Sequence, residues 1–162
     1  MPMALDAKAA TRTAEFLASE RAAIVDAALS AVVGAHASHY AAVGRDETLA
    51  RLEALFDRLI DTAGSRDVGG VVAYARQLAG ERFSAGYDLS EVQIAINALE
   101  EAVWRRIFSE LQADELAIAL GIVSTTLGTA KDALAREYVS LATHTRAPSL
   151  DLSALFAGVR QA

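Results

Sequence analysis

The chain has 162 residues, which is enough for one domain with a substantial hydrophobic core. Its formal net charge of −6 argues against nucleic acid as a direct partner, because an acidic surface repels phosphate backbones. It contains no cysteine, which excludes disulfides, thiolate catalysis and thiolate metal sites. The sequence shows neither a signal peptide nor an apolar run long enough to span a membrane, so we expect a soluble, cytoplasmic protein.

The composition indicates an all-α fold. Hydrophobic residues make up 53% of the chain, many of them alanine, and aromatic residues only 6%. The two prolines, Pro2 and Pro148, lie close to the ends, so the strongest helix breaker is absent from the sequence between them. We therefore predict a globin-like helical bundle of about five to six helices with a long C-terminal helix.

The first part of the chain predicts one long helix. Residues 4–14 are polar and alanine-rich, and they either extend this helix or fray. Apolar residues recur at helical spacing from Phe16 to Val32, and Gly34 weakens or ends the helix. Residues 36–44 are expected to form a short helical piece.

Three further helices follow before the last one. Asp46 is the predicted N-cap of the first of them, and Asp67 that of the second, which should stop near Gly86. The N-cap of the third is either Asp88 or Ser90. Its apolar stripe consists of Val92, Ile96, Leu99, Val103, Ile107 and Leu111.

The last helix carries the most regular pattern in the chain. Its stripe alternates spacings of 4 and 3 and comprises Leu116, Leu120, Val123, Leu127, Ala130, Leu134, Glu137 and Leu141. Such a heptad repeat favours left-handed helix packing, either within the bundle or partly as a dimer seam. Gly121 and Gly128, next to the stripe, permit a close neighbour. Glu137 is expected to weaken association, so that the helix leaves the bundle near this residue.

These patterns divide the chain into three parts. Residues 1–15 are an N-terminal extension, residues 16–143 the helical domain, and residues 144–162 a linker with a short C-terminal helix or tail. The tail is too short to persist as an isolated helix, so it should dock on the bundle or a partner, or stay disordered.

The sequence offers little support for a metal, haem or catalytic site. His36 and His39, at i, i+3 spacing, can face one metal ion, but zinc needs two further ligands. A role of either histidine as a haem ligand is also poorly supported. We favour a surface or interface role for both residues. The adjacent carboxylates Glu100 and Glu101 point about 100° apart on a helix, so they cannot share a substrate proton. We expect no catalysis, no cofactor and no metal.

Residues 75–107 resemble the N-terminal domain family of the RsbT co-antagonists, called RsbRD N-terminal. The features that carry the resemblance are Arg82, Gly86, Leu89, Glu91, Leu99 and Trp104, and the likeness extends over about residues 15–142. Glu100 departs from the family, which commonly has a basic residue there.

The resemblance implies a globin-like sensory or regulatory domain of stress-response signalling that binds no haem, forms dimers and leads through its last helix into an output domain. Within this frame Arg82 is expected to bond helix-end carbonyls or to pair with Glu91, with a ligand or partner contact as the alternative. Trp104 is expected to pack in the core, with a dimer contact as the alternative. Gly86 and Glu137 are the other candidate junction or contact residues.

Together these observations predict a non-catalytic signalling input domain that acts through protein contacts as a homodimer, with an output domain or protein as further partner. The alternative is a small-molecule sensor with its ligand held between helices. The two differ in one property, because a sensor needs an internal apolar pocket of roughly 300 Å³ or more.

Overall fold

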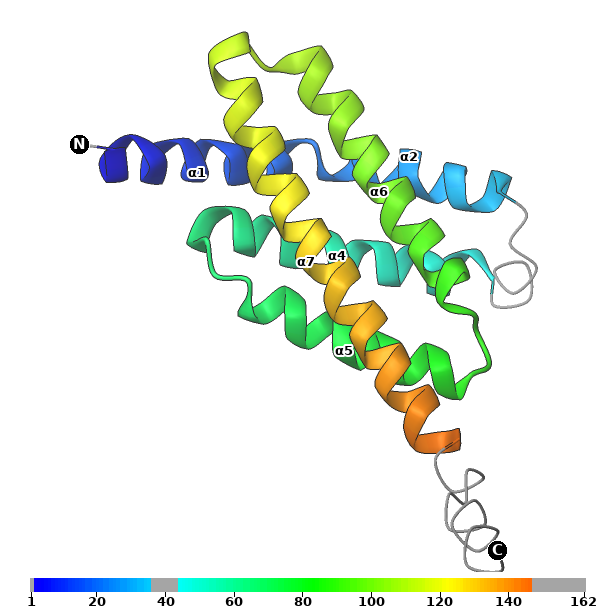
Figure 1. The fold of residues 1–162 in the computed structure, drawn as a ribbon. Coiled ribbons are helices and arrows are strands. Elements are labelled where there is room, and N and C mark those ends of the chain that lie inside the picture. Colours follow the sequence, from blue (N-terminus) through cyan, green and yellow to red (C-terminus); the bar gives the residue numbers. More distant parts are fainter. Residues whose placement is uncertain (1, 36–43, 147–162) are drawn as a thin grey trace, which may run out of the picture.

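The structure is a computed structural model that describes residues 2–35 and 44–146, and within these ranges it is entirely helical (Figure 1). The helices are α1 (Pro2–Ser19), α2 (Arg21–Gly34), α4 (Arg45–Ser65), α5 (Gly69–Ser84), α6 (Leu89–Glu110) and α7 (Ala113–Arg146). The predicted all-α fold with a long C-terminal helix is confirmed. None of the described helices is long and apolar enough to cross a membrane.

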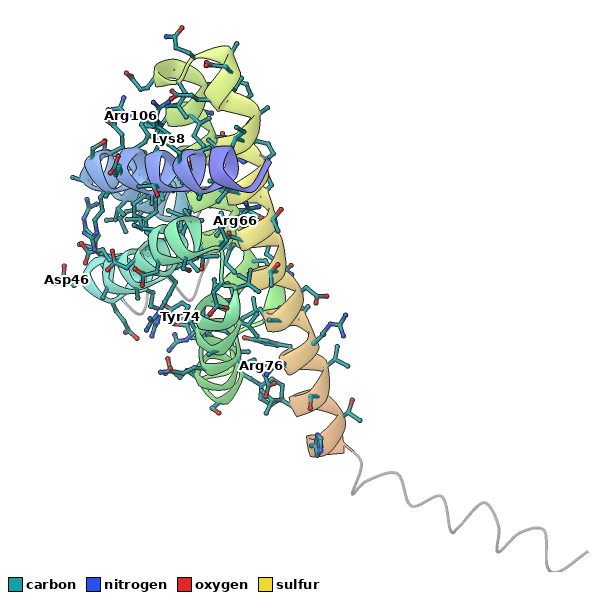
Figure 2. All side chains as sticks on the ribbon, turned by 90° about the vertical axis from the view of Figure 1, so that its left-hand side faces the viewer. Lys8, Asp46, Arg66, Tyr74, Arg76 and Arg106 are labelled. Atoms are coloured by element: carbon teal, nitrogen blue, oxygen red, sulfur yellow. The ribbon has the colours of Figure 1, made fainter. Side chains whose placement is uncertain are left out.

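The helices form two layers. In one layer α4 lies between the α1–α2 pair and α5, and in the other α6 and α7 run antiparallel across them (Figure 1). On this first layer α6 packs mainly against α2, and α7 mainly against α5. In the perpendicular view, α7 follows one edge of the molecule and its last turns extend past α5 (Figure 2).

The core lies between the layers and is mostly aliphatic. Its largest fully buried side chains are Leu17, Ile24, Leu29, Val32, Leu52, Phe56, Leu59, Ile96, Leu99, Ile107, Leu127 and Leu134. The smaller residues Val71 and Ala79 of α5 are also completely buried, which lets this helix approach α7 closely. The predicted stripes of α6 and α7 supply much of this core.

The predicted single helix through Phe16 and Val32 is interrupted, because α1 ends at Ser19 and α2 begins at Arg21. The Ser19 hydroxyl donates to the carbonyl of Phe16 at 2.8 Å, and the same carbonyl accepts from the Glu20 N–H at 3.1 Å. The alanine-rich start of the chain belongs to α1, in which Ala10 and Thr13 are buried.

Three predicted helix starts could be decided only from the structure. The N-cap of α5 is Val68, so the prediction of Asp67 is wrong, although the Asp67 side chain accepts from the Gly69 N–H at 2.8 Å. The N-cap of α4 is Gly44, with φ +90°, so the prediction of Asp46 is wrong; Asp46 lies in the first turn, where negative charge is also favourable. The N-cap of α6 is Asp88, whose side chain accepts from the Ser90 N–H while Glu91 accepts from the Asp88 N–H, forming a capping box.

Ion pairs join helices that are distant in sequence. Arg21 of α2 binds both carboxylate oxygens of Asp57 in α4, at 2.9 and 3.1 Å, and also Glu53. The hydrogen bond to Asp57 is the main cause of the raised pKa of Arg21. Arg12 of α1 similarly reaches Glu115 at the start of α7, at 3.0 Å.

Candidate interaction surface and the α5–α6 junction

Of the three histidines, only His144 lies within the described residues. It is exposed, and its Nδ1 lies 2.7 Å from the carbonyl oxygen of Ser140. His36 and His39, the pair considered for a metal, lie outside the described residues. Over residues 2–35 and 44–146, no group of three or more His, Asp and Glu side chains is placed to hold a metal ion.

Arg82, near the end of α5, is a buried contact point between helices. Only 8% of the residue is exposed. Its guanidinium carbon lies 4.6 Å from the ring centroid of Tyr87, and its Nη2 lies 3.8 Å from Oε1 of Glu47 in α4. Arg82 therefore reaches Glu47 and Tyr87 rather than Glu91, whose carboxylate caps α6.

The turn after Arg82 depends on Gly86. This glycine has φ +82°, a left-handed conformation that residues with a Cβ adopt at a cost. Its N–H donates to the Phe83 carbonyl, and the Tyr87 N–H donates to the Arg82 carbonyl at 3.0 Å. The turn thereby satisfies the last carbonyls of α5 and places Tyr87 beneath the guanidinium.

Tyr138 of α7 connects the same turn to the last helix. Its hydroxyl donates to the backbone carbonyl of Tyr87 at 3.3 Å, and its ring meets that of Phe83 edge-on at 5.7 Å. Sequence reasoning did not single out Tyr138, because its partners lie about 50 residues earlier in the chain. A displacement of α7 at this point has to disturb the α5–α6 turn.

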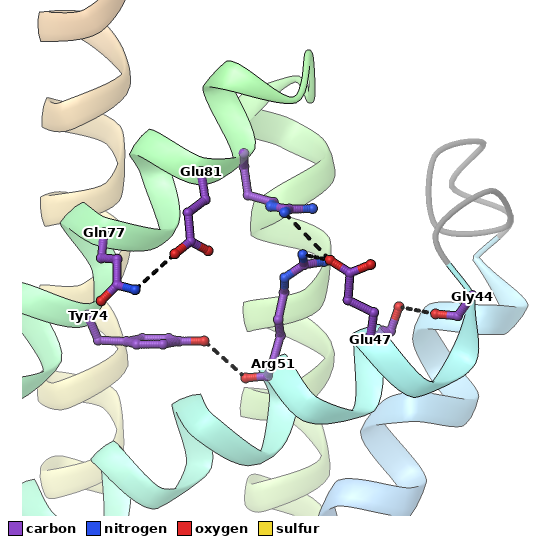
Figure 3. Close-up of polar contacts among 8 residues, drawn as sticks. Gly44, Glu47, Arg51, Tyr74, Gln77 and Glu81 are labelled. Atoms are coloured by element: carbon purple, nitrogen blue, oxygen red, sulfur yellow. Dashed lines mark hydrogen bonds and ion pairs between the residues drawn. The ribbon is translucent and has the colours of Figure 1, made fainter.

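A polar cluster on α4 and α5 adjoins Arg82 (Figure 3). Glu47 forms an ion pair with Arg51 one turn later, and the hydroxyl of Tyr74 donates to the Arg51 carbonyl at 3.3 Å. Burial raises the pKa of Tyr74, and the nearby cations of Arg51 and Arg82 oppose that rise.

Trp104 does not pack in the core, so the expectation that it does is wrong. It is 40% exposed, and Phe108, one turn later on the same face of α6, is 60% exposed. The physical reason is the position of the neighbouring helices, since α2 and α7 bury the side of α6 that carries Val103 and Ile107. The spacing of Trp104 and Phe108 alone was a signal that sequence reasoning missed.

The outward side of α7 adjoins this part of α6. Lys131 of α7 binds Glu100 of α6 at 2.6 Å, which fixes the two helices side by side. Ala117, Gly121 and Gly128 are exposed on α7. Ala117 and Gly121 also line a groove between the end of α4 and α7. We call the exposed set Trp104, Phe108, Ala117, Gly121 and Gly128 the α6–α7 outer face.

The stripe of α7 points the other way, into the chain's own core. Val123, Leu127, Ala130 and Leu134 are completely buried, so these residues are not available as a dimer seam. Glu137 is half-buried and lies nine residues after Gly128, which places it on the opposite side of α7 from the outer face.

Hollows large enough for a ligand lie at the surface. A groove of about 390 Å³ runs between α1 and the start of α7 and is lined in part by Arg12, Leu111 and Ile118. A second groove, of about 370 Å³, lies between the end of α4 and α7. In the described core, by contrast, the cavity beside Arg51 and Arg82 measures only about 20 Å³, far below the size that a drug-sized ligand needs.

The profile of the RsbT co-antagonist protein rsbRD N-terminal domain matches residues 19–147. The chain belongs to this family. The resemblance seen in residues 75–107 is thereby confirmed, and RsbRD N-terminal domains are regulatory domains of stress-response signalling. No curated protein and no solved structure matches the chain.

Proposed function

We propose that this RsbRD N-terminal domain is a non-catalytic signalling input domain that acts through protein contacts as a homodimer. The α6–α7 outer face is the proposed contact surface between the two copies. The observation that carries this proposal is the exposure of Trp104 and Phe108, 40% and 60%, in successive turns of one helix. Large aromatic residues are enriched where protein surfaces meet, and tryptophan dominates the binding energy of many interfaces.

Gly121 and Gly128 of α7 also favour the α6–α7 outer face as the contact surface. A glycine inside a helix costs roughly 0.5–1 kcal/mol relative to alanine, so its retention calls for a reason. A Cβ added at Gly121 or Gly128 meets no other atom within 4 Å among residues 2–35 and 44–146. Packing within the described chain therefore does not require these glycines, whereas a second helix crossing closely over α7 does.

The small core cavity supports a contact module over a ligand sensor. At about 20 Å³ it holds nothing of the size that a sensor of organic molecules recognises. We therefore propose protein contacts, rather than a ligand enclosed in the core, as the route by which this domain is controlled. The hollows of about 390 and 370 Å³ lie at the surface.

The far end of α7 is the proposed connection to the output. Beyond Tyr138 no residue of α7 with a described side chain is buried, although the helix continues to Arg146. These last turns extend past α5 (Figure 2). A rigid helix shared between a core and a partner transmits a change of packing as a shift or rotation.

Sedimentation equilibrium of the whole chain tests the dimer. The wild type is expected to be dimeric at tens of micromolar, and Phe108→Glu to shift the population towards monomer, because it buries a charge in the interface. Val33→Glu is the matched control, since Val33 is also exposed, at 51%, but lies at the end of α2. A monomeric wild type, or equal effects of the two substitutions, contradicts the proposed face.

A further inference from the structure

The small cavity beside Arg82 has a lining that is unusual for a protein core. The polar residues of the lining are Thr48, Arg51 and Arg82, and the remaining lining residues are aliphatic: Leu52, Leu55, Leu78, Val92, Ala95 and Ile96. Its volume of about 20 Å³ exceeds the 10–15 Å³ that a single water molecule needs. It therefore has room for one water molecule or one monatomic ion.

Arg82 brings an unsatisfied donor to this cavity. Its Nε is buried and has no hydrogen-bond partner, although the guanidinium is cationic. The contact with Glu47, at 3.8 Å, is too long for a direct hydrogen bond, and the Glu47 side chain is half exposed and also contacts Arg51. Because leaving a buried charged donor unpaired is costly, an acceptor is expected beside it.

The lining decides which acceptor fits. A buried water molecule makes about three hydrogen bonds, between two and four, and it has two hydrogens to donate. Guanidinium groups offer only donors, and the Thr48 hydroxyl already donates to the Gly44 carbonyl at 3.2 Å, which leaves its oxygen as the one side-chain acceptor in the lining. A halide ion accepts hydrogen bonds without donating any, and it tolerates the aliphatic wall.

The geometry points to a binding site for a single monatomic anion of the size of chloride, held by Arg82 in the cavity between α4, α5 and α6. This site is separate from the α6–α7 outer face and does not depend on the proposed dimer. Arg82 also stacks on Tyr87, whose carbonyl accepts from Tyr138 of α7. The anion thus lies next to the contacts that connect the α5–α6 turn to the last helix.

Chloride binding to the whole chain is testable without knowing the signal. In 35Cl NMR the wild-type protein is expected to broaden the resonance of sodium chloride in a saturable way, because bound chloride relaxes much faster than free chloride. Arg82→Lys keeps the charge but removes the Nε donor, and it should weaken binding about tenfold or more. Arg105→Lys is the matched control, since the Arg105 side chain is 79% exposed on α6 and should leave the broadening unchanged.

A second measurement needs no variant and holds even if Arg82→Lys fails to fold. The thermal unfolding midpoint of the wild type should be higher in sodium chloride than in sodium gluconate of equal ionic strength, because a ligand that binds only the folded state stabilises it. Equal midpoints without saturable broadening would show that the cavity holds water and overturn the proposal. Equal loss of broadening in Arg82→Lys and Arg105→Lys would also overturn it, by placing chloride elsewhere.

Discussion

Gly80 and Gly86 perform different tasks although they lie six residues apart. Gly86 has φ +82°, whereas Gly80 is helical, and a Cβ at either position meets no atom within 4 Å. The two glycines therefore differ in backbone conformation and not in the space around them. We expect Gly86→Ala to lower the free energy of unfolding by about 1–2 kcal/mol, because an L-residue strains the left-handed turn. Gly80→Ala should instead raise it by about 0.5–1 kcal/mol. Urea titrations of both variants check this, and shifts of the same sign would contradict it.

Glu100 is a second residue whose surroundings decide its contribution. In the sequence it directly follows Leu99 of the core stripe. In the structure only 16% of its side chain is exposed, and it binds Lys131, whose side chain is 28% exposed, at 2.6 Å. We expect Glu100→Ala to cost about 1–3 kcal/mol, the range for a shielded hydrogen bond between charged groups.

Asp132 supplies the control for that prediction. It pairs with Arg136 one turn later, but both side chains are more than 60% exposed. Asp132→Ala should therefore change the free energy of unfolding by no more than about 0.5 kcal/mol. If chemical denaturation gives the same loss for Glu100→Ala as for Asp132→Ala, the Glu100–Lys131 pair does not stabilise the α6–α7 contact.

At the scale of helices, periodicity was sufficient to find α6 and α7, and the central residues of their core stripes are buried as expected. Periodicity could not predict that Trp104 is exposed. Adjacent residues of a helix point about 100° apart, and the width of the buried side depends on where neighbouring helices pack. Periodicity likewise could not predict the ion pair of Glu100, since its partner Lys131 is 31 residues away in the chain. The N-cap of α4 was misplaced because Asp46 is suited both to an N-cap and to a first turn.

Gly128 provides a prediction about the surface of α7. Because a Cβ there meets no atom of the described residues within 4 Å, Gly128→Ala should stabilise a single copy by about 0.5–1 kcal/mol. In the proposed dimer the same methyl group lies between two helices, so it should weaken self-association. Unfolding measured in a monomeric Phe108→Glu background and sedimentation of the Gly128→Ala single variant separate the two effects. A more stable fold with unchanged association would place Gly128 outside the interface.

At the scale of the whole molecule, two features meet on α7. On its inward side Leu127 and Leu134 pack in the core, and its outward side carries the glycines of the proposed interface. A change of packing between two copies would therefore act directly on a helix whose Tyr138 contacts the α5–α6 turn and whose last turns lie beyond the core. This arrangement is what the proposed regulation through protein contacts requires.

The emission of Trp104 tests the proposed dimer most directly, because it is the only tryptophan in the chain and lies on the α6–α7 outer face. The wild-type protein is diluted while its mass is followed by sedimentation and its emission maximum by fluorescence. We predict that the emission maximum shifts to longer wavelength over the same concentrations at which dimer gives way to monomer, as the indole becomes hydrated. A chain that is monomeric throughout, or a dimer that dissociates without any change in Trp104 emission, would contradict the account.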